Sequence, residues 1–88
     1  MDKSLDKATR GRIFIRLERL KSGNYGDYKR FKGIVELRFH FEKGYRVYLG
    51  EDGISIVVLL AGGDKSSQQR DIIKALKYWE DYNEQKKI

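Results

Sequence analysis

The sequence predicts a small α+β domain in which an N-terminal and a C-terminal helix flank a three-stranded antiparallel meander. Three observations predict it. Apolar residues recur at helical spacing near both ends of the chain, apolar and polar residues alternate through its middle, and glycine-rich turns separate these segments. A chain of 88 residues fits one domain, so residues 1–88 are expected to fold as a single unit.

Residues 4–21 have the pattern of an amphipathic helix. Ile13, Leu17 and Leu20 recur at intervals of four and three residues and therefore share one face, with arginines around it. Gly23 follows, in the place where a glycine commonly ends a helix. The middle of the segment also alternates as a strand would, but its length and the glycine favour a helix.

The segment from Tyr25 to Lys32 predicts a long basic loop, because glycines and an aspartate stand among bases and aromatics. Aromatic rings beside cations are typical of surfaces that stack nucleic-acid bases, although the same rings could simply pack the loop. The candidate RNA- or ribosome-binding residues of this loop are Lys29, Arg30 and Lys32.

Strict alternation predicts two paired strands, over residues 34–41 and 45–49, that each bury one face. Glu42-Lys43-Gly44 predicts a three-residue turn between them, with Phe41 opposite Tyr45. In that register the core face pairs Phe39 with Val47 and Leu37 with Leu49.

The other face of these strands carries the candidate chemistry. The same register sets His40 opposite Arg46 and Arg38 opposite Tyr48, with Glu36 beside them. Arginines stay charged at neutral pH and could neutralise a phosphate and its pentacovalent transition state. His40 and Glu36 could move a proton, and Tyr48 could contact RNA. The alternative is a solvated sheet face with cross-strand ion pairs.

The segment that follows predicts a second hairpin turn, Gly50-Glu51-Asp52-Gly53, and a third strand, Ile54–Ala61. That strand is nearly all apolar, which is typical of an interior strand buried on both faces. The last strand of a meander lies at an edge, however. An exposed apolar edge invites pairing with another chain, so the chain is expected to form a homodimer or to aggregate through this edge, or to be stable only with a partner protein.

Gly62-Gly63-Asp64-Lys65-Ser66 predicts a sharp turn into the last helix, and Ser66 with Gln69 has the spacing of a capping box. The turn, with Lys65, could hold a phosphate or serve only as a tight turn and helix cap. The helix is expected over residues 67–82, with residues 83–88 frayed. Its predicted buried face consists of Ile72, Leu76 and Trp79.

Composition and charge limit the classes of function that fit this chain. The net charge is +6, and residues 1–50 carry 13 Lys or Arg against 6 Asp or Glu, so the excess lies in the first half. Such a domain suits a polyanion, nucleic acid or ribosome, although charge also serves solubility. The chain has no cysteine and one histidine, which argues against disulfides, thiolate catalysis and a metal site, and no cofactor is expected. Without a secretory h-region or an apolar run of spanning length, a cytoplasmic protein is expected.

Four motifs in order resemble the HigB-like "addiction module killer" group of the RelE/ParE toxin superfamily. They are Gly23-Asn24-Tyr25-Gly26-Asp27-Tyr28-Lys29, Glu36-Leu37-Arg38, Gly44-Tyr45-Arg46-Val47-Tyr48, and the segment from Leu59 to Gln68. The resemblance covers about residues 8–80. Relatives usually begin with a further strand, so the chain is expected to be an N-terminally shortened member.

The resemblance implies a toxin of a type II toxin–antitoxin system with its helices on one face of the sheet. It implies a ribosome-dependent mRNA endonuclease that uses no metal and leaves a 2′,3′-cyclic phosphate and a 5′-OH. It also implies a helix-turn-helix, HigA-like antitoxin. Arg46 matches an arginine that relatives carry on the sheet, Lys65 a basic residue of the turn, and Tyr78 or Tyr82 a tyrosine near their C-termini.

Two other readings stay open. One is a ParE-like inhibitor of DNA gyrase, and the other is a truncated, inactive toxin that only binds its antitoxin. The candidate catalytic residues are Arg46, Arg38, Lys65, His40 and Glu36. Of these, Arg38, Arg46 and Lys65 together favour the nuclease over the gyrase inhibitor, whereas the shortened N-terminus favours the inactive toxin.

Overall fold

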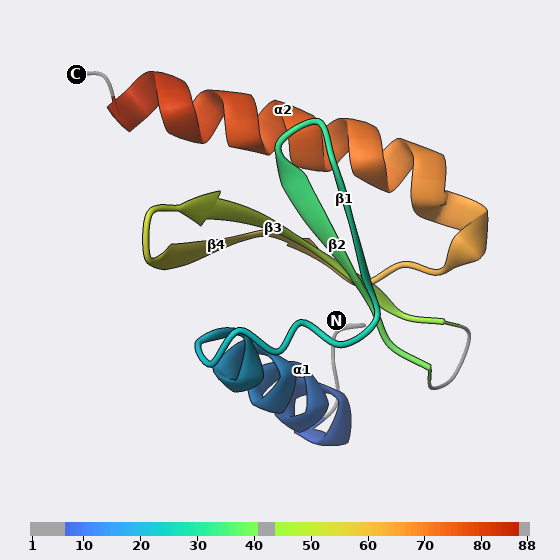
Figure 1. The fold of residues 1–88 in the computed structure, drawn as a ribbon. Coiled ribbons are helices and arrows are strands. Elements are labelled where there is room, and N and C mark those ends of the chain that lie inside the picture. The colour runs from blue at the N-terminus through green and yellow to red at the C-terminus, as the bar shows by residue number, and fades with distance from the viewer. Residues whose placement is uncertain (1–6, 41–43, 87–88) are drawn as a thin grey trace.

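The structure, a computed structural model, describes residues 7–40 and 44–86 and has an α+β fold (Figure 1). Four strands form one antiparallel sheet in the order β1-β2-β3-β4. The elements in chain order are α1 (Lys7–Leu20), β1 (Tyr28–Phe31), β2 (Ile34–Arg38), β3 (Arg46–Asp52), β4 (Ser55–Ala61), the 3₁₀ turn η1 (Lys65–Ser67) and α2 (Gln68–Lys86).

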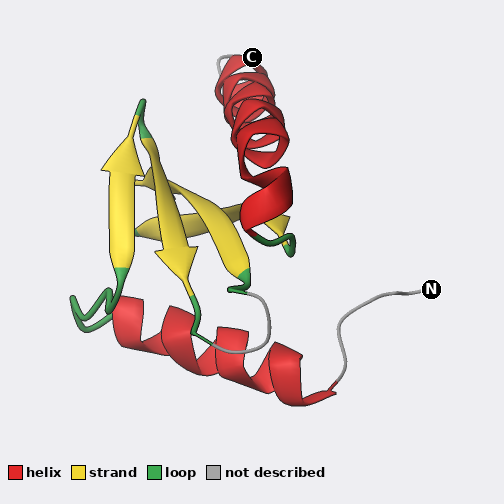
Figure 2. Ribbon diagram, turned by 90° about the vertical axis from the view of Figure 1, so that its right-hand side faces the viewer, coloured by secondary structure: helices red, strands yellow, loops and turns green. Residues whose placement is uncertain are grey.

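The two helices cover opposite faces of the sheet (Figures 1 and 2). Successive residues of a strand point to opposite faces, so β2 supplies both layers. Val35 and Leu37 pack with Ile13 and Leu20 of α1. Ile34 and Tyr48 instead pack against α2, where the predicted stripe of Ile72, Leu76 and Trp79 is confirmed. The arrangement with both helices on one face, which the resemblance implied, is therefore wrong.

The sheet has four strands rather than three, because β1 occupies part of the predicted basic loop. Phe31 pairs with Ile34, so Lys32 and Gly33 form a two-residue hairpin turn. Both turn residues have positive φ, 51° and 86°, as the turns that match strand twist require. The strand escaped prediction because Tyr28, Lys29 and Arg30 are exposed and carry no apolar alternation.

The register between β2 and β3 differs from the predicted one by two residues. Arg38, not His40, lies opposite Arg46, and the other pairs are Leu37 with Val47, Glu36 with Tyr48 and Val35 with Leu49. The connection is longer than a three-residue turn, since the Phe39 N–H already donates to the Tyr45 carbonyl at 2.9 Å. An even shift keeps the paired side chains of β2 and β3 on their predicted faces, so the predicted core face is confirmed. Phe41, Glu42 and Lys43 lie outside the described residues.

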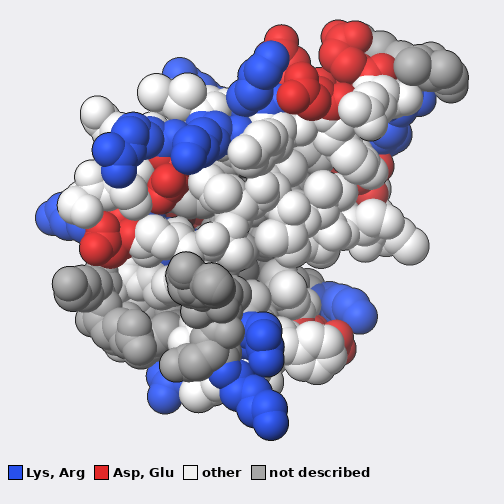
Figure 3. All heavy atoms as spheres, turned by 180° about the vertical axis from the view of Figure 1, so that it is seen from behind, with Lys and Arg blue, Asp and Glu red and all other residues white. Residues whose placement is uncertain are grey.

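The last strand is an edge strand and not an interior one. β3 continues to Asp52, and the turn is Gly53-Ile54 rather than Gly50–Gly53. Ile54 is fully exposed and Val58 is about half exposed. From behind, the middle of the molecule between the two helices shows few charged groups (Figure 3). The predicted homodimer through this edge stays a prediction.

The observed helix ends agree only in part with those predicted from the sequence. Gly23, at φ 84°, donates its N–H to the Leu20 carbonyl at 2.9 Å and ends α1 as expected. The cap before α2 is Asp64 with Ser67, not Ser66 with Gln69, because the Asp64 carboxylate accepts from the Ser66 N–H. Residues 83–86 are helical rather than frayed.

The C-terminal half of α2 packs closely against β3. The Trp79 ring lies directly over Gly50, where a Cβ would stand 2.3 Å from two ring carbons. Tyr82 stacks on Trp79 with ring centroids 5.5 Å apart, and its hydroxyl donates to Asp52 at 2.7 Å. Lys86 donates to the same carboxylate at 2.7 Å. These contacts hold the last turns of α2 against the sheet and account for the helical residues 83–86.

We expect Gly50→Ala to lower the free energy of unfolding by about 1–3 kcal/mol, because the added methyl overpacks the Trp79 contact. Gly11→Ala is the matched control. A Cβ at Gly11 meets nothing within 4 Å, and alanine favours the helix by about 0.5–1 kcal/mol, so this variant should gain stability. Urea unfolding measures both. A Gly50→Ala protein as stable as the parent would contradict the contact.

Candidate functional site

The site is built around Glu36, a carboxylate in the middle of the sheet with no exposed surface. Strand alternation points it toward α2, and the register sets it beside Tyr48. Its Oε2 accepts from the Tyr48 hydroxyl at 3.1 Å and from the Gln68 amide at 2.9 Å. Its Oε1 accepts from the Arg38 Nε at 3.2 Å. Residues from β2, β3 and α2 therefore converge on one carboxylate, and we call Glu36, Arg38, Arg46, Tyr48 and Gln68 the Glu36 cluster.

Both arginines of the cluster compensate the buried charge. The Nε of Arg46 lies 3.6 Å from Oε2, on the other side of the carboxylate from Arg38. A buried carboxylate is costly unless it is paired and hydrogen-bonded, and here three groups donate to it while the Arg46 guanidinium adds a positive charge beside it. Two guanidinium groups meet one carboxylate, so the Glu36 cluster keeps about one net positive charge.

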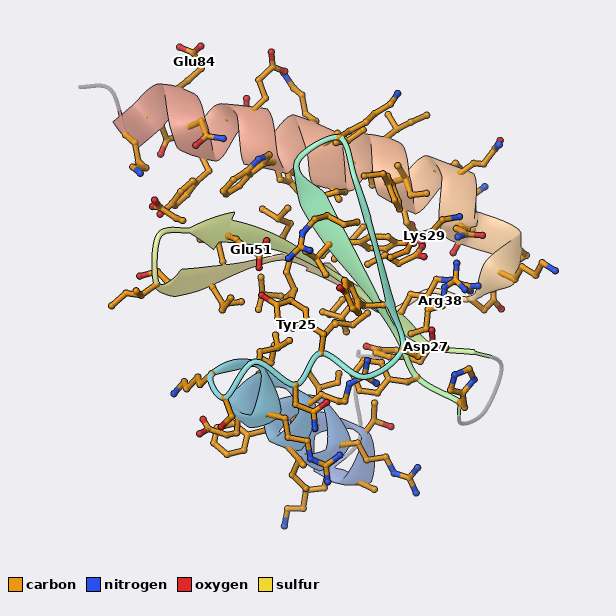
Figure 4. The ribbon with its side chains drawn as sticks, in the orientation of Figure 1. Tyr25, Asp27, Lys29, Arg38, Glu51 and Glu84 are labelled. Atoms are coloured by element: carbon orange, nitrogen blue, oxygen red, sulfur yellow. The ribbon has the colours of Figure 1, made fainter. Side chains whose placement is uncertain are left out.

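The arginines lead from this buried centre to the surface. Arg38 and Arg46 stand directly opposite each other in the register, with side chains 34% and 13% exposed. Arg38 extends from the end of β2 toward the start of α2 (Figure 4). Lys29 lies opposite Glu36 in the β1–β2 register and therefore on the same face. The predicted polar face is thus neither open nor solvated, because α2 covers its centre and leaves cations at its margin.

The chemistry of the cluster is electrostatic. Burial raises the pKa of Tyr48 far above its usual range, and the neighbouring Glu36 charge adds to this, so the phenol keeps its proton and donates it. The Glu36 oxygens are engaged by their donors. Arginine remains charged and can bind a phosphate through a planar fork of N–H groups. The cluster is therefore suited to holding an anion rather than to accepting a proton.

The structure brings together three of the five residues predicted to be catalytic, Glu36, Arg38 and Arg46. His40 is not opposite Arg46. It lies on the α1 side of the sheet, where its Nε2 is 2.5 Å from an Asp27 carboxylate oxygen. Lys65 is exposed at the start of η1, one turn ahead of Gln68.

The predicted RNA-contacting residues are also divided. Tyr48 is fully buried within the Glu36 cluster, and Lys29 lies exposed at its margin. Lys32 is exposed in the β1–β2 turn, and Arg30 is on the opposite face. There Arg30 is paired with Glu51 at 3.0 Å, and its guanidinium lies over the Tyr25 and Tyr28 rings.

Gln68 is the residue of the site that sequence reasoning missed. It stands four residues before Ile72, seven before Ala75 and eleven before Trp79, which is the spacing of one helix face. A polar residue on an otherwise apolar, buried stripe was the signal that could have identified it. The sequence could not show which residue Gln68 contacts, because that contact depends on α2 covering the face of the sheet that carries Glu36.

The chain is 48% identical over 67 residues to a Haemophilus influenzae protein that bears the name "Uncharacterized protein". The match covers 75% of this chain and 68% of that protein, and the chain therefore belongs to the same family. A comparison with models of known protein families gives no match, and no solved structure matches. None of the helices in the described part of the chain is long and apolar enough to cross a membrane.

We expect Glu36→Gln to destabilise the fold by about 3 kcal/mol, because it leaves Arg46 without a counter-charge in a largely buried place. The control is Glu18→Gln. Glu18 pairs with Lys21 at 3.3 Å, but both side chains are well exposed, so the change should stay within about 0.5 kcal/mol. Urea unfolding at neutral pH compares the two. Equal, small effects would mean that Glu36 is not the electrostatic centre of the sheet.

A second prediction concerns pH. A hydrogen bond from Tyr25 and the Arg30 charge lower the pKa of Glu51 below its ordinary value. A carboxyl with a depressed folded pKa stabilises the protein above its unfolded pKa, near 4.5, and the contribution is lost as the pH falls. Glu51→Gln should therefore lower the melting temperature at pH 7, and this deficit should shrink as the pH falls below the unfolded pKa. Tyr25→Phe should weaken this acid dependence, and a Glu51→Gln deficit that persists unchanged to pH 3 would contradict it.

Proposed function

We propose that the protein is a HigB-like toxin of the RelE/ParE superfamily and cleaves mRNA on the ribosome without a metal ion. The observation that carries the proposal is the Arg38–Arg46 pair. The two arginines stand opposite each other at one end of the sheet, are held by a buried carboxylate and extend toward the surface beside the start of α2. The four sequence motifs of the toxin group support the same function.

The proposed reaction is attack of a ribose 2′-OH on the adjacent phosphate, with release of a 5′-OH and formation of a 2′,3′-cyclic phosphate. Charge builds up on the phosphate oxygens as the pentacovalent state forms. Arg38 and Arg46 are the groups that would stabilise it, and one such contact is typically worth ~10²–10³ in rate. Glu36 would act as a positioning residue, because it accepts a hydrogen bond from the Arg38 Nε and forms an ion pair with the Arg46 Nε at 3.6 Å.

His40 is our candidate for proton transfer. Imidazole is the side chain whose protonation changes most readily near neutral pH, and Asp27, at 2.5 Å, would orient its ring. His40 follows Arg38 by two residues, at the same end of β2. It stands on the other side of the sheet, so in this proposal the substrate reaches around that end. Lys65 is the further candidate cation, in the turn before α2.

The proposed partners follow from charge and from the resemblance. A net charge of +6 favours the ribosome and mRNA, with Lys29 and Lys32 as exposed contacts. Arg30 is the weaker candidate because Glu51 already holds its guanidinium. A helix-turn-helix, HigA-like antitoxin would neutralise the toxin, and the proposed location of both is the cytoplasm.

The experiment is induction of the toxin in cells, followed by mapping of new mRNA 5′ ends. Arg46→Lys keeps the charge beside Glu36 but loses the planar fork, so we expect cleavage to slow by about 10²–10³ while the domain stays folded by circular dichroism. Lys77→Ala, which removes an exposed charge from the middle of α2, should leave cleavage unchanged.

The outcome separates the three functions. Cuts within translated codons, lost in Arg46→Lys, support the nuclease. Intact mRNA with DNA damage would overturn it in favour of gyrase inhibition. Intact mRNA and DNA, with growth unaffected and antitoxin still bound, would identify an inactive toxin.

A further inference from the structure

An exposed aromatic and cationic surface lies at the β1 edge of the sheet, on the face that α1 packs against. Tyr28 and Arg30 of β1 pair with Leu37 and Val35 of β2, so both side chains point to the α1 side. Tyr28 is 42% exposed, and the Arg30 side chain is 51% exposed. The Glu36 cluster lies on the other face, and the proposed cleavage step does not use this surface.

Three side chains form the surface, which we call the Tyr28 platform: Tyr25, Tyr28 and Arg30. The ring centroids of Tyr25 and Tyr28 are 4.9 Å apart, and the ring planes are tilted by 46°. The Arg30 guanidinium carbon lies over both rings, 5.5 Å from the Tyr25 centroid and 5.6 Å from the Tyr28 centroid. At these distances a guanidinium attracts the faces of both rings, so the three groups hold one another in place.

Hydrogen bonds from the rest of the fold also fix the platform. Glu51 of β3 accepts from the Arg30 Nη2 at 3.0 and 3.1 Å, and from the Tyr25 hydroxyl. Arg16 of α1 donates to the Tyr25 carbonyl at 3.1 Å and to the Asp27 carbonyl at 3.0 Å. Tyr25 lies between α1 and the sheet, on the side of Glu51 (Figure 4). A ligand would therefore meet side chains that are already ordered, which lowers the entropic cost of binding.

The members of the platform differ in what they do for the fold. Tyr25 is partly buried and packs against the apolar core on the α1 side, so its ring serves the packing of the loop. Tyr28 remains exposed although both other groups contact it. Arg30 is a poor ligand for phosphate, because Glu51 already offsets its charge. Stacking, however, uses the flat face of a guanidinium and needs no free N–H group.

We propose that the Tyr28 platform binds an unpaired base of a single-stranded nucleic acid by stacking. Proteins recognise single strands through bases that stack on tyrosine rings and on arginine guanidinium planes. Such stacking tolerates any base, since each base has a flat π-face. Lys29 and Lys32 are exposed in the same β1–β2 hairpin, where they can contact the phosphates of the bound strand. RNA is the strand that the proposed function implies, but the stacking itself does not rest on that function.

The first measurement separates the base from its phosphate. The probes are a short oligoadenylate with 2′-O-methyl riboses, which cannot be cleaved, and an abasic strand of the same length and charge. The oligoadenylate should shift the Tyr28 ring signals upfield in NMR spectra, because the ring current of a stacked base shields them. The abasic strand should leave these signals in place. Equal shifts with both strands, or none with either, would overturn the stacking site.

The second measurement removes the ring. Tyr28→Leu should weaken binding of the oligoadenylate about 5- to 140-fold. The slope of log affinity against log salt should stay the same, because the variant loses no charge. Tyr28→Phe keeps the ring and should bind as the parent does. Phe14→Leu removes an exposed ring, 61% exposed, from α1 beside β4 at the opposite edge of the sheet, and should also bind as the parent does.

Parent-like binding by Tyr28→Leu, or a loss of affinity that appears as a smaller salt slope, would overturn the site. If circular dichroism shows that Tyr28→Leu is poorly folded, the comparison of the two strands on the parent protein still decides. Neither measurement needs the ribosome or cleavage. Binding that depends on the Tyr28 ring in a protein that never cuts mRNA would support the platform and overturn the proposed function. Codon-specific cuts with oligoadenylate binding unchanged in Tyr28→Leu would do the reverse.

Discussion

The structure depends on one buried carboxylate. Glu36 has no exposed surface, and donors from β2, β3 and α2 meet on its two oxygens. A charge in this place is tolerated only because two arginines flank it and two neutral donors complete its hydrogen bonds. The same contacts order the surface, since the Arg38 Nε donates to Glu36 and the Arg46 Nε forms an ion pair with it at 3.6 Å. The same two arginines therefore compensate the buried charge of Glu36 and form the cationic pair near the surface.

That arrangement divides the sheet into two chemically different faces. On the α1 side the buried core is apolar, through Val35, Leu37 and Val47. On the α2 side the apolar contacts of Trp79 and Leu76 lie toward one end, and the Glu36 cluster occupies the other. A short C-terminal helix over only the apolar part would leave Glu36 exposed. The first residue of α2, Gln68, closes the polar end instead.

The sequence predicted the helices and strands themselves better than it predicted which of them lie next to each other. Periodicity identified both helices, their apolar faces and the core residues of β2 and β3, because side-chain burial repeats with the backbone geometry. It missed β1, whose stability comes from ladder hydrogen bonds and a positive-φ turn at Lys32-Gly33 rather than from buried side chains. It also misjudged the β2–β3 register, since the turn length depended on residues whose pattern is equally compatible with strand and loop. Because of that error, His40 was wrongly predicted to lie opposite Arg46. Glu36, Arg38 and Tyr48 share one face in both the predicted and the observed register.

The contact between Trp79 and Gly50 has a consequence for how this family can vary. The ring of Trp79 occupies the volume that any side chain at position 50 would need, across two elements that are far apart in the sequence. A larger side chain at position 50 therefore requires a smaller one at position 79. In relatives with this packing, a residue larger than glycine at position 50 should accompany a smaller one at position 79. Covariation of this pair in an alignment would then record the docking of the last helix, independently of any residue that takes part in function.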